Sequence, residues 1–505
     1  MAQTLNVLIV NGHPRKNSLS EAFARSFYLG VSGQKIPCKL LNLYELSFNL
    51  NVIHHSPKKQ LTEDVDIPKA QELISWANHI VFIYPTWWGT VPALLKGFID
   101  RSFTEGFAFQ EIEGGTGYAP LFKGKTAQLI TTMDTPYLVY SVLYRAPGNN
   151  MLSKATLGFC GFHISKITTF NPVRGSNAAT RDKWIGEVHA LGAALKDGPL
   201  TIYQKTLIRI FAWLKAIRLQ FYPMTFLAYW AGAQLAASMG FQFNRAIFWI
   251  GYLWLFLLEI ATVLSNDFFD YQTDEKNKYF SPFSGGSRVL VEGDLSFSEV
   301  KKAIIACITA AVLLNILLFT IIPNSLSNLL PATLVLTVLA LGYSIPPLKL
   351  ACRTLGEITV GFTHSFAVIL CGFVFMGGSC TNVTLWILGL PLFLSILPSI
   401  TLAGIPDYDA DKQVEKETIA VRLGRKNAAL IAVTFAWLAV IAVILLKNRL
   451  FDGLLYGAVP HVFLLSGLIY RYVNNAEAPK RIDWILVCAL TFIMWFVIVP
   501  LYHLT

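Results

Sequence analysis

The chain has 505 residues, of which 54% are hydrophobic and 14% are charged, and its formal net charge is +10. With a mean hydropathy of +0.50, so little charge argues against an ordinary soluble enzyme and excludes a disordered or fibrous chain. Length and composition fit one soluble domain beside a large membrane bundle. We expect no nucleic-acid partner, because lysine and arginine also collect on the cytoplasmic loops of membrane proteins.

The seven cysteines show no CxxC pair and no zinc-ligand spacing, and four of them lie in or beside apolar runs. This usage indicates reduced thiols in a reducing compartment. The apolar run at residues 5–10 is too short for the core of a signal peptide. We therefore expect the N-terminus to start inside the cell.

Residues 1–198 are predicted to form a soluble α/β domain, because short β-branched runs alternate with amphipathic helical segments. Such alternation predicts a doubly wound parallel sheet covered on both faces, with its ligand beyond the carboxyl ends of the strands. The predicted strands are 6–10, 39–42, 79–84 and 126–131, and the predicted helices are 19–29, 66–77, 91–103 and 181–195.

Two strand ends in this domain carry candidate ligand-binding residues. The first strand runs into NGHPRKNSLS at 11–20 and then into a helix. Hydroxyls and N–H groups at such a helix start suit a cofactor phosphate, with an ordinary helix cap as the alternative. Trp87 and Trp88 follow the third strand. They suit a flat aromatic ligand, with core packing as the alternative.

These segments resemble the flavodoxin-like NAD(P)H:quinone oxidoreductases over nearly the whole domain, in GHPRKNSLS at 12–20, YPTWWGTVPALLKGFIDRSF at 84–103, GFAF at 106–109 and KGK at 123–125. The resemblance implies a bound FMN or FAD, hydride delivery from NAD(P)H and, often, a homodimer. The implied phosphate contacts are His13, Ser18, Leu19 and Ser20, and the implied flavin contacts are Thr86, Trp87, Trp88 and Gly89, followed by Thr131 and Thr132. Residues 133–137 read MDTPY where many relatives have a double glycine, which leaves FMN or FAD open.

After residue 199 the composition changes, and apolar stretches of roughly 20 residues, the length that spans a membrane, follow one another. Residues 199–218 are the predicted linker and interfacial segment, and 219–505 the predicted membrane domain. We expect an all-α bundle of nine spans, starting near residues 222, 246, 302, 326, 357, 384, 427, 453 and 482.

The connections after spans 2, 4, 6 and 8 carry most of the positive charge of this half, whereas the opposite connections offer only Arg245, Lys447 and Arg449. This asymmetry predicts a multi-pass protein of the cytoplasmic membrane with its N-terminal domain in the cytoplasm.

Two clusters of carboxylates are expected on the cytoplasmic side of the bundle. The first is NDFFDYQTD at 266–274, where spacings of four place Asn266, Asp270 and Asp274 on one helix face. The second contains Asp407, Asp409 and Asp411. Ionised side chains near a bilayer are costly unless they are paired or bind a cation. Carboxylates from two helices facing one cavity suit Mg²⁺, which completes its shell with phosphate oxygens and water. Solvated helix ends are the alternative.

Both motifs resemble those of the UbiA superfamily of intramembrane aromatic prenyltransferases, as do GGSR at 285–288, YSIPPLK at 343–349 and residues 418–424. The resemblance implies nine helices around a cavity that admits lipid tails, with an isoprenyl diphosphate held by Mg²⁺ between the motifs. The implied metal-binding residues are Asn266, Asp267, Asp270, Asp274, Asp407 and Asp411. The implied diphosphate contacts are Arg218, Arg288, Lys349, Arg353 and Lys412, with an ordinary interfacial anchor as the alternative for Arg218, which lies just before the first span. Asp267, Asp270, Asp407 and Asp411 are also the implied catalytic residues, together with Tyr343, which either stabilises the allylic cation or belongs to the aromatic belt. The GGSR text looks closest to members that prenylate naphthalene-type acceptors in menaquinone synthesis.

The two halves suggest a bifunctional enzyme, because electrophilic prenylation needs an electron-rich ring and a quinol is richer in electrons than its quinone. The flavin domain is then expected to reduce a quinone with NAD(P)H, and the membrane domain to prenylate the quinol. One alternative is a regulatory flavin head on a prenyltransferase that uses a hydroxynaphthoate. A more distant alternative is a membrane transporter with a fused redox-regulatory domain.

Overall fold

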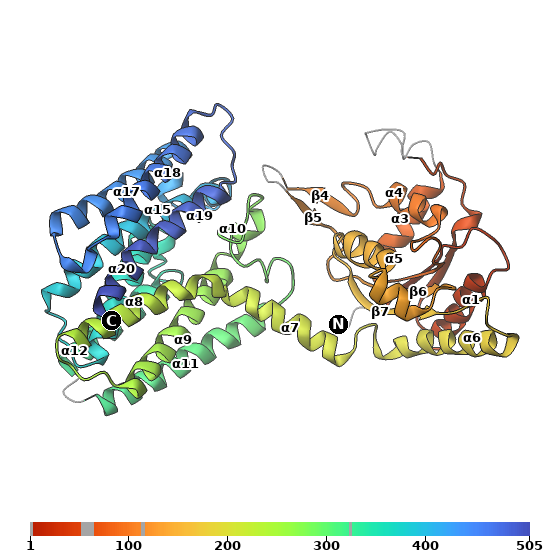
Figure 1. Ribbon diagram of the computed structural model, residues 1–505, viewed down its shortest axis with the longest axis horizontal. Helices are drawn as coiled ribbons and strands as arrows, with labels where there is room; N and C mark the ends of the chain where they lie inside the picture. The colour runs from red at the N-terminus through yellow and green to blue at the C-terminus, as the bar shows by residue number, and fades with distance from the viewer. Residues whose placement is uncertain (1–3, 52–64, 113–116, 323–325) are drawn as a thin grey trace. The chain divides into compact units, whose positions relative to one another are not determined.

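The computed structural model describes residues 4–51, 65–112, 117–322 and 326–505, which fold as two compact units. The first unit runs to Ile208, and the main part of the second begins at Arg209. Each unit has its own hydrophobic core. Figure 1 shows the α/β unit in red to yellow and the helical unit in yellow through green to blue.

The first unit contains a five-stranded, entirely parallel sheet with the strand order β2-β1-β3-β6-β7. The strands are β1 (Val7–Asn11), β2 (Cys38–Asn42), β3 (His79–Pro85), β6 (Thr126–Thr132) and β7 (His163–Phe170). A separate antiparallel pair is formed by β4 (Phe109–Glu111) and β5 (Tyr118–Pro120). The parallel sheet confirms the predicted fold class, although the pattern did not predict β7.

Alternate side chains of β1 enter different cores, as expected for a strand buried on both faces. Val7 and Ile9 pack with one cluster and Leu8 and Val10 with the other. The helices of this unit are α1 (Leu19–Ser32), α3 (Asp66–Trp76), α4 (Ala93–Ser102), α5 (Pro147–Asn150) and α6 (Ala178–Ala193). Helices α1 and α6 pack so closely at Gly30 that a Cβ there would lie 2.2 Å from a carbonyl oxygen of α6. Only glycine leaves room for this approach.

The predicted linker 199–218 is largely helical, since α7 spans Ile202–Ile217. The C-terminal part of α7 belongs to the second unit and is held there by ion pairs. Lys215 Nζ lies 2.5 Å from a Glu292 carboxylate oxygen and 3.2 Å from one of Asp294, and Arg209 pairs with Glu299.

The second unit is a helical bundle. Its longer helices are α8 (Tyr222–Ser238), α9 (Arg245–Phe269), α11 (Phe297–Ile321), α12 (Leu326–Gly342), α15 (Val383–Gln413), α17 (Arg425–Leu446) and α18 (Leu454–Asn474). Two further helices of membrane-spanning length each consist of two segments. The first comprises α13 (Gly356–Phe362) and α14 (Val368–Phe375), and the second comprises α19 (Asp483–Ile493) and α20 (Trp495–Leu504). The short helices α10 (Tyr271–Lys276) and α16 (Ile419–Leu423) follow α9 and α15.

Within the described residues, seven helices are long and apolar enough to cross a membrane, so this is a multi-pass membrane protein. Helices also lie at the two other predicted positions, but α8 and α12 have only 17 residues each. At 1.5 Å per residue they are about 26 Å long, slightly less than a hydrocarbon core of about 30 Å.

Candidate functional site

In the first unit, the predicted flavin residues gather at the carboxyl ends of β1, β3 and β6, which are neighbours in the sheet. The rings of His13 and Trp87 meet edge to face, with centroids 5.5 Å apart. The Thr86 and Thr131 hydroxyl oxygens lie 2.6 Å apart, and the Thr86 N–H donates to the Thr132 carbonyl at 2.7 Å. Parallel pairing thus joins three segments that lie far apart in the chain.

The turn 87–90 presents a flat aromatic side chain to solvent. Trp88 has a φ of 50° and an entirely exposed side chain, and Gly89 follows with a φ of 78°. A backbone hydrogen bond holds this turn, because the Gly148 N–H donates to the Gly89 carbonyl at 2.8 Å. An exposed indole on a fixed turn can stack on a planar ring.

The start of α1 already has an internal cap, because the Ser18 hydroxyl accepts from the Glu21 N–H at 3.2 Å. Ser18 is therefore a helix cap, and Leu19 and Ser20 form the first turn of α1. Burial and the neighbouring Arg15 charge lower the pKa of His13. Its imidazole therefore stays neutral at pH values where an exposed histidine would already be protonated. A flavin phosphate here would rely on the N–H groups of the helix start.

In the second unit, the first carboxylate motif runs through the junction of α9 and α10. The helical register continues across it, with backbone N–H bonds from Asp270 to Asn266 and from Asp274 to Asp270. These three side chains therefore share a face, as their spacing predicts. Asp267 points elsewhere and accepts from both the N–H and the hydroxyl of Ser287.

The second motif lies in the last turns of α15, and the segment after α10 connects the motifs. The Asn277 side-chain amide donates to Asp407 Oδ1 at 2.7 Å. Asp411 is almost fully buried. Asp409 does not join them, because its carboxylate pairs with Arg425 at 2.8 Å and with Lys480 at 3.3 Å.

Lys416 stands between the two motifs. Its Nζ lies 2.9 Å from Asp270 Oδ2 and 3.6 Å from Asp411 Oδ1, and its side chain is only 13% exposed. Burial lowers the pKa of Lys416, but the carboxylates of Asp270 and Asp411 outweigh it and raise that pKa well above the usual value. The lysine is therefore a fixed positive charge in the site.

The carboxyl groups of the two motifs nonetheless outnumber this lysine. Burial, followed by the charges of Asp267 and Asp407, raises the pKa of Asp274 well above its usual range. No three histidine, cysteine or acidic side chains of the described chain form a ready metal cage. Mg²⁺ needs none, because it commonly takes one or two carboxylates and completes its octahedron with water and substrate phosphates. The residues present fit such a cation.

The glycine-rich loop packs directly on this acidic surface. A Cβ on Gly286, whose φ is 69°, would lie 2.0 Å from Asp274 Oδ2. The Arg288 guanidinium donates to the carbonyl of Asp274 at 2.6 Å and lies 4.0 Å from the Phe280 ring centroid. Arg288 therefore fixes the loop around the first motif.

Among the described residues, the other basic side chains predicted at the diphosphate form no ion pair with the two motifs. Lys349, Arg353 and Lys412 are exposed, Arg353 donates to the Pro347 carbonyl at 3.0 Å, and Lys412 lies 6.0 Å from the Tyr408 ring centroid. Arg218 lines a cavity in the bundle together with Asn266 and Tyr343.

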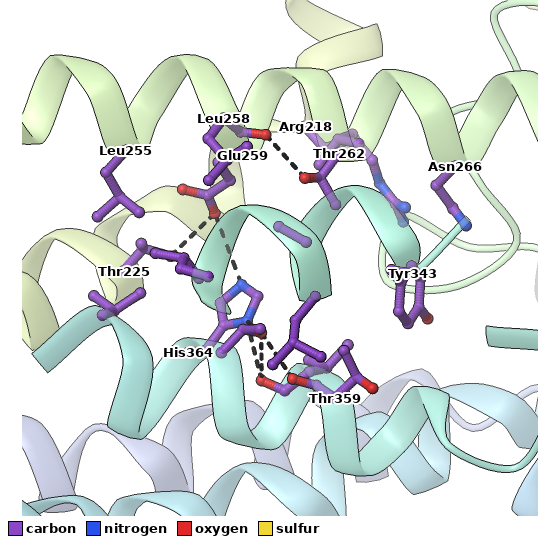
Figure 2. Close-up of a pocket in the computed structure, with 17 residues that line it drawn as sticks. Arg218, Thr225, Leu255, Leu258, Glu259, Thr262, Asn266, Tyr343, Thr359 and His364 are labelled. Carbon is purple, nitrogen blue, oxygen red and sulfur yellow. Dashed lines mark hydrogen bonds and ion pairs between the residues drawn. The ribbon is translucent and has the colours of Figure 1, made fainter. Parts of the chain in front are cut away.

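That cavity has a volume of about 190 Å³ and a mostly apolar lining from α8, α9, α12 and α13–α14. Figure 2 shows Asn266 and Tyr343 at one end and Thr225, Glu259 and His364 towards the other. The cavity therefore connects the first acidic motif with a second polar cluster. An apolar chamber beside a cation site is suited to an allylic diphosphate, because it shields a carbocation from water.

Two family models match the chain. Residues 224–497, more than half of the chain, match the family model described as the UbiA prenyltransferase family. The chain belongs to the UbiA prenyltransferase family. Residues 5–191 match the model described as a flavodoxin-like fold. The chain is thus a UbiA prenyltransferase fused to a flavodoxin-like NAD(P)H quinone oxidoreductase domain.

Relatives match each half separately. Ribosyldihydronicotinamide dehydrogenase [quinone] of Pongo abelii is 30% identical to this chain, and the match covers 31% of this chain and 78% of the relative. The Homo sapiens enzyme of the same name is 36% identical, and the match covers 23% of this chain and 52% of the relative. The chain thus spans about half of the human enzyme. Lycopene elongase/hydratase of Corynebacterium glutamicum is 27% identical over 40% of this chain and 67% of its own length. A solved UbiA homolog from Archaeoglobus fulgidus, bound to GPP and Mg²⁺, is 15% identical over 57% of this chain and 99% of its own, with a TM-score of 0.42.

Sequence reasoning missed three contacts of this UbiA site. Lys416 was not among the predicted site residues, and the contacts of Asn277 and Ser287 with the carboxylates had no signal in spacing. All three lie in or beside connections between helices, where periodicity does not fix side-chain direction. The cluster of Glu259, Thr225 and His364 was also missed, since none of the three was among the predicted site residues.

Proposed function

We propose that this protein is a bifunctional enzyme of prenylquinone synthesis, in which the flavodoxin-like domain reduces a quinone to its quinol with NAD(P)H and the UbiA domain prenylates the quinol. The observation that carries the proposal is that Lys416 forms ion pairs with both Asp270 and Asp411, which belong to separate motifs. Asn266 of the first motif also lines an apolar cavity. That arrangement suits an isoprenyl diphosphate bound through Mg²⁺, and the fused reductase domain suits an acceptor that must be reduced first.

In this proposal Asp267, Asp270, Asp274, Asp407 and Asp411 serve Mg²⁺, with Asn266 beside them. Lys416 and Arg218 face the diphosphate, while Lys349, Arg353 and Lys412 act at the entrance. Mg²⁺ supplies charge neutralisation as the allylic C–O bond ionises. The apolar walls exclude water, and the Tyr343 ring stabilises the cation through its π face.

The flavodoxin-like domain would hold FMN or FAD. The ring would stack at Trp87 and Trp88, near Thr86 and Gly89, and the phosphate would lie at the helix start after His13. The bound flavin supplies hydride acceptance from NAD(P)H and two-electron donation to the quinone. We further propose 1–198 as the reductase domain, 199–218 as the connecting segment and 219–505 as a nine-span membrane domain, with the reductase and both aspartate motifs facing the cytoplasm.

The decisive experiment supplies purified full-length protein with NADPH, Mg²⁺, 1,4-naphthoquinone and an isoprenyl diphosphate, and measures prenylated product by mass spectrometry. Product should require NADPH, and a Trp87→Ala, Trp88→Ala double variant should lose it. Chemically reduced quinol should restore product in that variant and leave an Asp270→Ala, Asp407→Ala variant inactive. Equal product from the quinone without NADPH would refute coupling and leave a regulatory head.

A second candidate acceptor is a polyene hydrocarbon, because the UbiA half is similar to a lycopene elongase/hydratase and the cavity walls are mostly apolar. Such an acceptor needs no prior reduction. Incubation of the same protein with a polyene and an isoprenyl diphosphate, without NADPH, tests it directly. Elongated polyene as the only product would replace the quinol proposal.

A further inference from the structure

One carboxylate of the cavity has no part in the aspartate motifs. Glu259 lies in α9, about two helical turns before Asn266, and its side chain is 11% exposed. An acidic side chain within a membrane span is costly, and it usually marks a function when it faces a cavity. Glu259 faces this cavity, as Figure 2 shows.

The partners of Glu259 hold only one of its two oxygens. The Thr225 hydroxyl from α8 donates to Oε1 at 3.0 Å, and His364 Nε2 lies 4.0 Å from the same atom. Oε2 makes no hydrogen bond to any residue that the structure describes. The carboxylate is thereby oriented and keeps one oxygen for a ligand in the cavity.

The contacts of His364 indicate which ring nitrogen carries its proton. Nδ1 lies 3.1 Å from the Val360 carbonyl oxygen, which can only accept. A neutral His364 therefore carries its hydrogen on Nδ1 and leaves the Nε2 lone pair on the side of Glu259. The pair offers a carboxylate as the first proton acceptor and an imidazole as the second.

The spacing along α9 relates this pair to the diphosphate end of the cavity. Asn266 lies seven positions after Glu259, which corresponds to about 10 Å along the helix. An aromatic ring lying between them can have a hydroxyl at Glu259 while its nucleophilic carbon faces the allylic end near Tyr343.

We infer that Glu259 is the proton acceptor for a hydroxylated aromatic acceptor, with Thr225 and His364 as its positioning residues; this rests on the prenyltransferase activity proposed above. The acceptor O–H bond breaks, and its proton goes to Glu259. The oxygen electron pair moves into the ring, whose carbon bonds to the allylic carbon as the C–O bond to diphosphate breaks. The resulting dienone tautomerises when the ring hydrogen moves to oxygen. Rotation of the carboxyl group then brings this proton to the side of His364, whose Nε2 accepts it.

The substrate class follows from this chemistry. A quinol has the hydroxyl that Glu259 needs, whereas a quinone or a polyene hydrocarbon has none. The cluster of Glu259, Thr225 and His364 therefore selects the reduced acceptor within the cavity itself. This selection explains why a reductase domain that makes the quinol is fused to the prenyltransferase.

The test measures prenylation of 1,4-dihydroxynaphthalene, supplied already reduced, by the wild type and by Glu259→Gln, Thr225→Val and Glu477→Gln variants. Glutamine keeps the size and the acceptor for Thr225, and Glu477 is an exposed loop residue that controls for expression and reconstitution. General base catalysis typically contributes about 10²–10⁴-fold, so E259Q should lose at least about 10²-fold in turnover. T225V should lose less, and E477Q should match the wild type.

A second measurement separates chemistry from folding. Binding of the isoprenyl diphosphate with Mg²⁺, and its slow hydrolysis without an acceptor, should be unchanged in E259Q. Turnover within about threefold of wild type would overturn the inference, as would loss of diphosphate binding together with transfer, which would make Glu259 structural. A wild type that prenylates no aromatic diol would instead refute the proposed function.

Discussion

Replacing Lys416 with methionine tests whether one buried lysine occupies the cation position between the two aspartate motifs. The side chains of Lys416, Asp270 and Asp411 are 13%, 12% and 2% exposed, so solvent screens their charges little. Removing one partner from a buried ion pair typically costs roughly 3–5 kcal/mol, because an uncompensated charge stays behind. Two carboxylates are left here, so we expect at least about 3 kcal/mol in the absence of Mg²⁺.

The assay is thermal unfolding of the full-length protein in lipid nanodiscs, with and without Mg²⁺. Using about 2–4 °C per kcal/mol, the unfolding midpoint of the membrane domain should fall by roughly 6 °C or more in K416M without Mg²⁺. Added Mg²⁺ should recover much of the loss, because it neutralises the same carboxylates. Lys412→Met, which changes an exposed neighbour, should shift the midpoint little. If K416M unfolds like K412M without Mg²⁺, or if Mg²⁺ rescues nothing, the assignment is wrong.

Three other predictions concern the loop and the flavin site. Gly286→Ala should lose prenyl transfer and destabilise the protein by more than Gly293→Ala: both have positive φ, but only the Gly286 Cβ would collide with Asp274. Thermal unfolding and product formation compare the two variants, and equal losses would remove the role of that contact. Trp88→Ala should leave stability within about 0.5 kcal/mol, since the side chain is fully exposed, yet weaken flavin binding measured by fluorescence titration. Unchanged flavin affinity would exclude Trp88 from the site. Because the pKa of His13 is lowered in the folded protein, the unfolded chain takes up a proton first as the pH falls. The contribution of the neutral His13 to folding stability is therefore present above about pH 6.5 and declines as the pH falls towards the folded pKa. His13→Gln should flatten that decline in unfolding midpoints measured from pH 7.5 to 5, and an unaltered profile would contradict the cause given.

Much of the fold follows from local patterns. Alternating strand and helix segments predicted the parallel sheet, and helices occur at all nine positions where the sequence suggested spans, although α8 and α12 are shorter than the others. The strand β7 escaped prediction because its residues HISKITTF alternate poorly, and it is recognised as a strand only through its pairing with β6. Periodicity reports the environment of one segment, whereas pairing depends on a partner elsewhere in the chain.

The sequence by itself located the two carboxylate motifs, because charge retained in an apolar half of the chain is costly and its helical spacing can be counted. Only the tertiary structure decided which cation stands between them and which acid faces the cavity. Lys416, and not the exposed Lys412, reaches both motifs after the chain turns at the end of α15. Glu259 meets Thr225 and His364 from two other helices. Such contacts depend on how helices pack and connect, and no spacing within one helix specifies them.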